Sequence, residues 1–326
     1  MMYVHINNVE YFLPKKKENN LKFLREIGKN KRTSEKIIKK IGIKNRRVAG
    51  KNVYSNDLAI KSAKKIFKKI NKNNIDFLIY CTQTPDYLIP TNACIIQDQL
   101  KLKKKIGAFD INLGCSGYVY SLSIAKSLII SQQAKNILLI TSDTYSKFIK
   151  KDDLSTKLIF SDSSTTTLVS SKKTKNSFKI LNSTYGTDGS GYKEFILRNF
   201  GAKFKDKPAK DGNFINMNGA GIFDFTLKEI PQAVYFFLKK NKLKINKIDY
   251  FIFHQANQFI VENLQTKMGI ARNKVILDVK DIGNTVSGTI PIILSKYGKK
   301  IKSGSYVLLV GFGVGLSWGI TLIKKN

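Results

Sequence analysis

Amphipathic helix patterns alternate with short apolar runs along this chain, and this alternation constrains the fold more than any other feature. Residues 58–70 place apolar side chains at three- and four-residue intervals with lysines between them, which predicts a helix with one buried face. The next run, 77–81 (FLIYC), is short and rich in β-formers, which predicts a strand covered on both sides. The pattern continues with predicted helices over 92–100 and 116–131 and predicted strands over 108–112 and 137–141. This alternation predicts an α/β fold built on a parallel sheet.

The second part of the chain repeats this order. It contains predicted helices over 223–238, 257–268 and 287–300 and predicted strands over 250–254, 275–277, 306–311 and 316–323. We therefore expect two copies of one topology, residues 1–172 forming the first half and residues 173–326 the second. The segment 171–219, rich in Lys, Gly and Asn, is the predicted boundary between them.

The composition predicts a folded protein without membrane-spanning or disulfide-bonded parts. Of the 326 residues 42% are apolar, which suffices for a substantial core, and no stretch of about 18 apolar residues occurs. The first residues show no apolar run behind a basic head, so we expect no secretion signal. Cys81, Cys94 and Cys115 form no CxxC pair and have no histidine nearby in sequence, which argues against a disulfide framework or a zinc site. A reducing cytoplasm is the expected compartment.

The charge is strongly basic. The chain has 57 Lys and Arg against 23 Asp and Glu, a net charge of +34 that would attract nucleic acid, an anionic membrane or an acidic protein. The lysines are scattered along the whole chain with many Ile and Asn, as expected from an A/T-rich genome, whereas nucleic-acid binders usually concentrate their charge with aromatic residues. Codon bias is therefore the favoured interpretation, nucleic-acid binding is disfavoured, and an acidic protein partner stays compatible with either origin.

Three polar residues follow predicted strands. Cys115 follows the strand over 108–112, His254 closes the strand over 250–254, and Asn284 follows the strand over 275–277. Ligands of parallel sheets collect at these strand ends, so the three side chains are expected at one site.

Each of the three residues also has a structural interpretation. Cys115 lies between two glycines at a predicted helix start, where backbone amides favour a reactive thiolate, but a buried structural cysteine is equally expected. A single histidine such as His254 is more often structural than functional, and Asn284 after a glycine suits a turn. The combination of the three residues is more informative than any one of them.

Several motifs, in order, resemble the β-ketoacyl-acyl carrier protein synthase III family over nearly the full chain. They are residues 42–47 (GIKNRR), 114–117 (GCSG), 217–219 (MNG), 254–257 (HQAN), 283–285 (GNT) and 311–319 (GFGVGLSWG). The resemblance implies a thiolase-like α/β fold, in which two duplicated βαβαβαββ halves form five layers in the order αβαβα. The first half would carry the nucleophilic cysteine, and the second half the histidine and the asparagine.

The resemblance also implies a two-step reaction. Cys115 would take a primer acyl group from an acyl-CoA, with the amides of Cys115 and Val314 facing the developing oxyanion. A malonyl thioester would then lose CO2, and His254 and Asn284 would hold its enolate while the carbanion attacks the acyl-cysteine. Phe312 would shield the carbanion from water. The product would be a 3-oxoacyl thioester for fatty acid or specialised lipid biosynthesis, made without a metal or a permanently bound cofactor.

The chain departs from the family pattern at several positions. A tryptophan and an arginine that commonly clamp coenzyme A fall on Lys36 and Lys40, which can hold a phosphate but cannot stack or form a planar fork. Phe259 replaces an arginine that commonly docks acyl carrier protein, and the glycine-rich segment of the family reads FSDSSTT over 160–166. Ile89 falls where a dimer mate usually donates an aromatic side chain to the acyl pocket.

We therefore expect a homodimeric cytoplasmic condensing enzyme that uses acyl-CoA and has an acyl carrier protein as its second partner. The alternative is an acyltransferase of the same fold that passes the acyl group from Cys115 to an amine or an alcohol. Asn284 favours condensation because an acyltransferase needs no second enolate donor, whereas the altered docking residues favour the alternative.

Overall fold

The computed structural model describes residues 2–198 and 213–326, and its centre is a nine-stranded sheet in the order β11-β12-β13-β8-β1-β7-β6-β4-β5. The strands are β1 (His5–Phe12), β4 (Phe77–Cys81), β5 (Gly107–Ile111), β6 (Asn136–Asp143), β7 (Ser163–Ser170), β8 (Phe178–Thr187), β11 (Tyr250–Phe253), β12 (Tyr306–Gly313) and β13 (Ser317–Lys325). Short strands form two further pairs, β2 (Lys17–Asn19) with β3 (Asn45–Arg47) and β9 (Phe195–Leu197) with β10 (Ile215–Met217).

The described helices are α1 (Asn20–Glu26), α2 (Lys31–Ile41), α3 (Ser55–Ile66), α4 (Asn92–Gln99), α5 (Gly117–Ile130), α6 (Leu154–Lys157), α7 (Gly219–Lys240), α8 (Gln258–Lys267) and α9 (Thr289–Tyr297). None of the helices in the described ranges is both long and apolar enough to cross a membrane.

The strand order confirms the predicted duplication. From the centre outwards the sheet reads β1, β7, β6, β4, β5 on one side and β8, β13, β12, β11 on the other. On each side the second strand is antiparallel to its neighbours, whereas β6, β4 and β5, and likewise β12 and β11, are parallel. β1 and β8 join the two sides through two residue pairs only.

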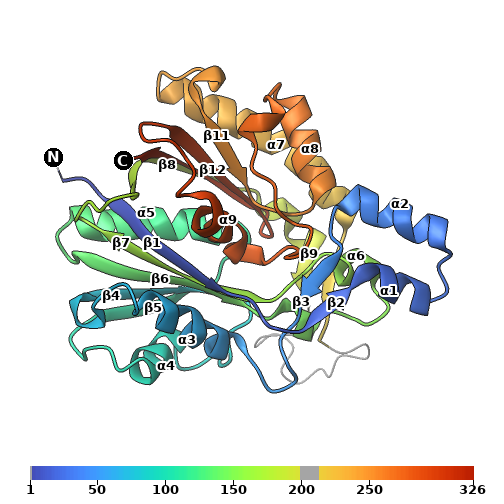
Figure 1. Ribbon diagram of the computed structural model, residues 1–326, viewed down its shortest axis with the longest axis horizontal. Coiled ribbons are helices and arrows are strands. Elements are labelled where there is room, and N and C mark those ends of the chain that lie inside the picture. The colour runs from blue at the N-terminus through green and yellow to red at the C-terminus, as the bar shows by residue number, and fades with distance from the viewer. Residues whose placement is uncertain (1, 199–212) are drawn as a thin grey trace.

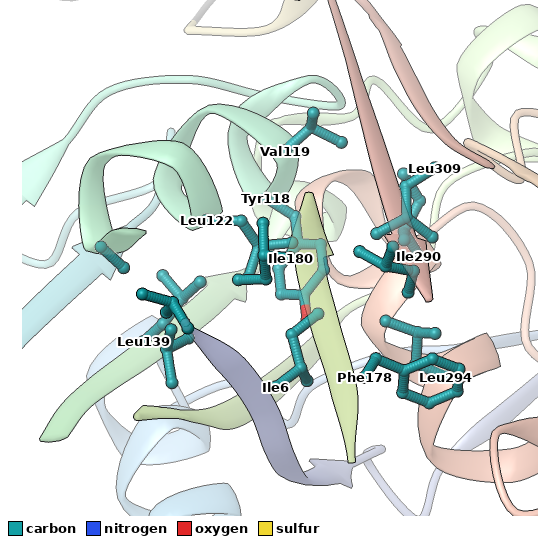
Figure 2. Close-up of a cluster of buried hydrophobic side chains, with 14 of the residues drawn as sticks. Ile6, Tyr118, Val119, Leu122, Leu139, Phe178, Ile180, Ile290, Leu294 and Leu309 are labelled. Carbon is teal, nitrogen blue, oxygen red and sulfur yellow. The ribbon is translucent and has the colours of Figure 1, made fainter. Parts of the chain in front are cut away.

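Helices and strands form five layers (Figure 1). Helices α3 and α4 cover β4 to β7 on one outer face, α7 and α8 cover β11 to β13 on the other, and α5 and α9 lie between the two groups of strands. Figure 2 shows Tyr118 and Leu122 of α5 and Ile290 of α9 packed against side chains of the central strands. Burial of each such side chain contributes about 1.5–3 kcal/mol, so the middle layer fixes the starts of α5 and α9 relative to one another.

The structure differs from the expected elements at two places in the second half. The expected strand over 275–277 is a single bridge between Phe251 and Val275, because the Gln255 side chain bonds the backbone of Ile276 and Asp278 in place of a strand partner. The segment 171–219 is not simply a boundary, because it contains β8 at the centre of the sheet. Its many Lys, Asn and Ser residues hid that strand; residues 199–212 of this segment lie outside the described residues.

Candidate active site

Cys115 lies at the turn from β5 to α5 and is 6% exposed. The turn needs its two glycines: a Cβ on Gly114 would lie 2.4 Å from Gln83 Oε1, and a Cβ on Gly117 would lie 2.4 Å from Cys81 Sγ. Gly313 approaches from the opposite side, where an added Cβ would lie 2.9 Å from Cys115 Cβ. The glycines therefore allow the backbone to enclose the thiol closely.

Burial raises the pKa of the Cys115 thiol, and the nearby Asp143 carboxyl raises it further. This effect opposes the stabilisation of the thiolate that the helix start predicted. The start of α5 can still stabilise charge that develops there during a reaction.

His254 lies directly after β11, and its backbone N–H donates to Val310 O at 2.7 Å. The imidazole is 2% exposed, and its ring meets the Phe312 ring edge-on with 5.5 Å between centroids. Nδ1 lies 2.8 Å from Thr289 Oγ1. Burial lowers the pKa of His254 to about 3, so the imidazole is neutral at physiological pH.

Asn284 is held by its backbone and by its own side chain. Its N–H donates to Ile159 O at 3.0 Å, and its carbonyl accepts from Ser161 N at 2.7 Å. The preceding Gly283 has φ +73°, a conformation that favours glycine. The side-chain Oδ1 accepts from Val286 N at 2.9 Å, so Nδ2 faces His254 Nε2 at 3.4 Å.

These three side chains line one largely apolar pocket. Its walls are formed by Cys115, Ile159, Phe160, Phe195, Met217, Gly219, Ile222, His254, Ala256, Asn257, Ile260, Asn284, Phe312, Gly313 and Val314. The structure thus brings Cys115 and Asn284, which are 169 positions apart along the chain, into one pocket. A buried nucleophile beside two polar donors can hold an acyl thioester and polarise its carbonyl.

The other residues predicted from the sequence fall in different places. Phe312 and Val314 are in the pocket wall. Ile89 is 88% exposed and lies outside this wall. Lys36 and Lys40 are exposed on α2, and Lys40 Nζ lies 4.4 Å from the centroid of the Phe259 ring on α8.

Sequence reasoning missed the buried carboxyl group that supports the site. Asp143, at the end of β6, accepts hydrogen bonds from Gln83 N at 2.8 Å and from Ser287 Oγ at 3.0 Å. It thereby joins the loop after β4 to the loop that follows Asn284. The only sequence signal was an acidic residue closing an apolar strand, which is too common to single out.

Asp143 predicts a specific dependence of stability on pH. Burial raises its pKa to about 7, so between about pH 4 and pH 7 the folded chain binds a proton that the unfolded chain lacks. Stability from this group therefore falls as pH rises through 7. Relative to Asp143→Asn, the free energy of unfolding of the wild type should fall by about 2–3 kcal/mol from pH 5 to pH 8. Urea unfolding of both proteins across this range measures the difference, and a pH-independent difference would contradict the assignment.

Two family models match the chain. The model of 3-oxoacyl-[acyl-carrier-protein (ACP)] synthase III matches residues 109–189, which include Cys115. The model of the C-terminal part of 3-oxoacyl-[acyl-carrier-protein (ACP)] synthase III matches residues 238–325, which include His254 and Asn284.

Individual proteins match over most of their length. The chain is 36% identical over 285 residues to a β-ketoacyl-[acyl-carrier-protein] synthase III of Clostridium perfringens, covering 86% of this chain and 87% of the relative. It is 33% identical over 326 residues to the protein of that name from Clostridioides difficile, covering 98% and 97%. Among solved structures, a 3-oxoacyl-(acyl-carrier-protein) synthase III at 2.1 Å superimposes with a TM-score of 0.90 and 34% identity over 99% of both chains.

Proposed function

Because the chain belongs to the β-ketoacyl-[acyl-carrier-protein] synthase III family, we propose that it condenses a Cys115-bound acyl group with a malonyl thioester to give a 3-oxoacyl thioester. The observation that carries this proposal is the position of Cys115, His254 and Asn284 around one apolar pocket. The proposed division of the chain follows from it: residues 1–172 supply the nucleophile, and residues 173–326 supply the two enolate donors.

The first step is acyl transfer. The Cys115 sulfur attacks the carbonyl carbon of an acyl-CoA, the carbon–sulfur bond to coenzyme A breaks, and the thiol proton leaves with the coenzyme A sulfur. The backbone N–H groups of Cys115 and Val314 are the proposed donors to the oxyanion of the tetrahedral intermediate. The neighbouring Gly313 supports this role, because it lets the loop approach Cys115 closely.

The second step forms the new carbon–carbon bond. The malonyl thioester loses CO2, and the electron pair of the broken bond becomes an enolate whose oxygen accepts from His254 and Asn284. The enolate carbon attacks the acyl carbon on Cys115, and the sulfur leaves as a thiolate that takes up a proton. Phe312, edge-on to the His254 ring, excludes water from the carbanion.

Asn284 favours condensation over acyl transfer to an amine or an alcohol. Its Nδ2 is directed toward His254 Nε2, so both groups reach the same small region of the pocket. An acyltransferase needs donors for one oxyanion at Cys115. It does not need His254 and Asn284 as a second pair of donors. Incubation with an acyl-CoA and a malonyl thioester should give the 3-oxoacyl product by mass spectrometry; an amide or ester product with amines or alcohols, and no 3-oxoacyl product, would favour the acyltransferase.

The proposed partners are acyl-CoA and an acyl carrier protein in a reducing cytoplasm, where a free thiol nucleophile persists. The net charge of +34 supports an acidic carrier. Lys36 and Lys40, both on α2, are candidates for the phosphates of coenzyme A or of the carrier. The Lys40 ammonium lies over the Phe259 ring in a cation–π contact, so that lysine and that aromatic ring would act together.

We propose a homodimer formed at the edge of the sheet. β5 ends the described sheet, and such an edge is usually paired or covered. The adjacent loop exposes three apolar side chains, since Tyr87 is 58%, Leu88 64% and Ile89 88% exposed. Asp110 of β5 anchors the end of this loop by accepting from Asn92 N at 2.6 Å. A second copy that covered both the edge and the loop would bury these groups.

The dimer predicts a mutational effect at the loop. Ile89→Asp should shift the protein to a monomer, because an unpaired charge would be buried in the proposed contact. Phe236→Asp is the matched control, since Phe236 is 63% exposed on α7 and outside the proposed interface. Sedimentation velocity should show a dimer for the wild type and Phe236→Asp and a monomer for Ile89→Asp; a monomeric wild type would refute the interface.

A further inference from the structure

We propose that Thr289 is a positioning residue that holds His254 in the tautomer with its proton on Nε2. The inference rests on the proposed function, because only an Nε2–H group can donate to the enolate oxygen. Thr289 is the first residue of α9 and is 3% exposed. Its Oγ1 lies 2.8 Å from His254 Nδ1, within hydrogen-bond distance.

The hydroxyl of Thr289 has one proton and two acceptors within reach. One acceptor is His254 Nδ1 at 2.8 Å, and the other is Val286 O at 3.1 Å. Val286 O already accepts from the backbone N–H of Thr289, so it needs no second donor. His254 Nδ1 has no other donor among the described residues. Donation from Oγ1 to Nδ1 therefore satisfies both acceptors, and the proton of the neutral imidazole is then on Nε2.

The distance between His254 and Asn284 supports the same tautomer. Asn284 Nδ2 is a donor because Oδ1 of the same amide accepts from Val286 N. Its separation of 3.4 Å from His254 Nε2 is longer than an ordinary hydrogen bond between these groups. With the proton on Nε2, both groups are donors 3.4 Å apart, and the region that they face is left for an acceptor such as an enolate oxygen.

The opposite tautomer would weaken the site. With the proton on Nδ1, His254 would donate to Thr289 Oγ1, and the lone pair of Nε2 would point at the incoming oxygen. That lone pair would repel the enolate oxygen and would also accept a hydrogen bond from the Asn284 amide. Thr289 thus selects between two forms of the same neutral ring.

Nitrogen NMR of the full-length protein tests the tautomer directly. The chain has only two histidines, His5 and His254, so selective 15N labelling of histidine gives two rings that His5→Gln assigns. At neutral pH we expect a protonated, pyrrole-type Nε2 and an unprotonated, pyridine-type Nδ1 for His254. A pyrrole-type Nδ1 in the wild type would overturn the proposal.

Variants separate positioning from mere packing. Thr289→Val keeps the shape but lacks the hydroxyl, so the His254 signals should move toward the Nδ1–H tautomer and CO2 release from malonyl thioester should fall about 100-fold. Acylation of Cys115 should continue, and Thr289→Ser should restore both the signals and the rate. Thr321→Val is the control, because Thr321 of β13 is also buried and its hydroxyl bonds Ser183 Oγ at 2.8 Å, outside the pocket wall.

The outcomes distinguish this proposal from the proposed function. An Nε2–H tautomer that persists unchanged in Thr289→Val would refute the role of Thr289 and leave condensation intact. Failure of the wild type to form an acyl adduct would refute condensation, while the nitrogen signals would still report the tautomer. Should Thr289→Val fail to fold, the spectra of the wild type and of Thr289→Ser still decide which nitrogen of His254 carries the proton.

Discussion

Cys115→Ala is expected to abolish acylation by acyl-CoA and to lower condensation by about 10,000-fold or more, as when other covalent enzymes lose their nucleophile. The reason is that no other thiol lines the pocket: Cys81 is buried in β4, and Cys94 is exposed on α4. Intact-protein mass spectrometry after incubation with acyl-CoA measures the adduct. The wild type should gain the mass of one acyl group and Cys115→Ala none.

Cys94→Ala is the matched control for this experiment. Cys94 is an exposed free thiol, so it would be the site of any nonspecific acylation. The Cys94→Ala protein should keep the full adduct and normal turnover. An adduct that persists in Cys115→Ala but disappears in Cys94→Ala would contradict the assignment of the nucleophile.

Asn284→Asp is expected to lower CO2 release from malonyl thioester by about 100- to 1,000-fold while acylation of Cys115 continues. The substitution preserves the size of the side chain but replaces the Nδ2 donor by an oxygen, and an ionised carboxylate would repel the enolate. Radiolabelled CO2 release and adduct formation, measured on the same preparation, separate the two steps.

The unchanged acylation step is the internal control for Asn284→Asp. Equal losses in both steps would show that Asn284 shapes the pocket as a whole. An unchanged rate of CO2 release would show that Asn284 does not hold the enolate, and it would favour transfer to an amine or an alcohol.

The sequence predicted the three central residues of the site because their signals are local. Cys115, His254 and Asn284 each follow an expected strand end or a glycine-rich turn, and strand ends of a parallel sheet meet at one edge. The alternation of helices and apolar runs likewise predicted most of the elements. These patterns depend on residues close together in the chain, so they can be recognised in a single sequence.

The supporting groups depend on contacts between distant segments. Asp143 bonds Ser287 across 144 positions, and Thr289 meets His254 across 35. Their residue types are common in strands and at helix starts, so neither stood out.

The hydroxyl-rich strand β7 shows the same limit. Its first residues belong to the segment 160–166, where the family motif has glycines, and its Ser164 and Thr166 hydroxyls lie 2.8 and 2.6 Å from Ser62 Oγ of α3. The sequence showed that the glycines were replaced. Only the fold shows that the hydroxyl groups of Ser164 and Thr166 are paired in the interior.

The most direct test of the central claim is to follow the mass of the acylated wild-type protein after malonyl thioester is added. The account predicts that the acyl mass on Cys115 disappears as CO2 is released and that the same acyl group is recovered in a 3-oxoacyl thioester. An adduct that resists malonyl thioester and is discharged only by an amine or an alcohol would contradict condensation.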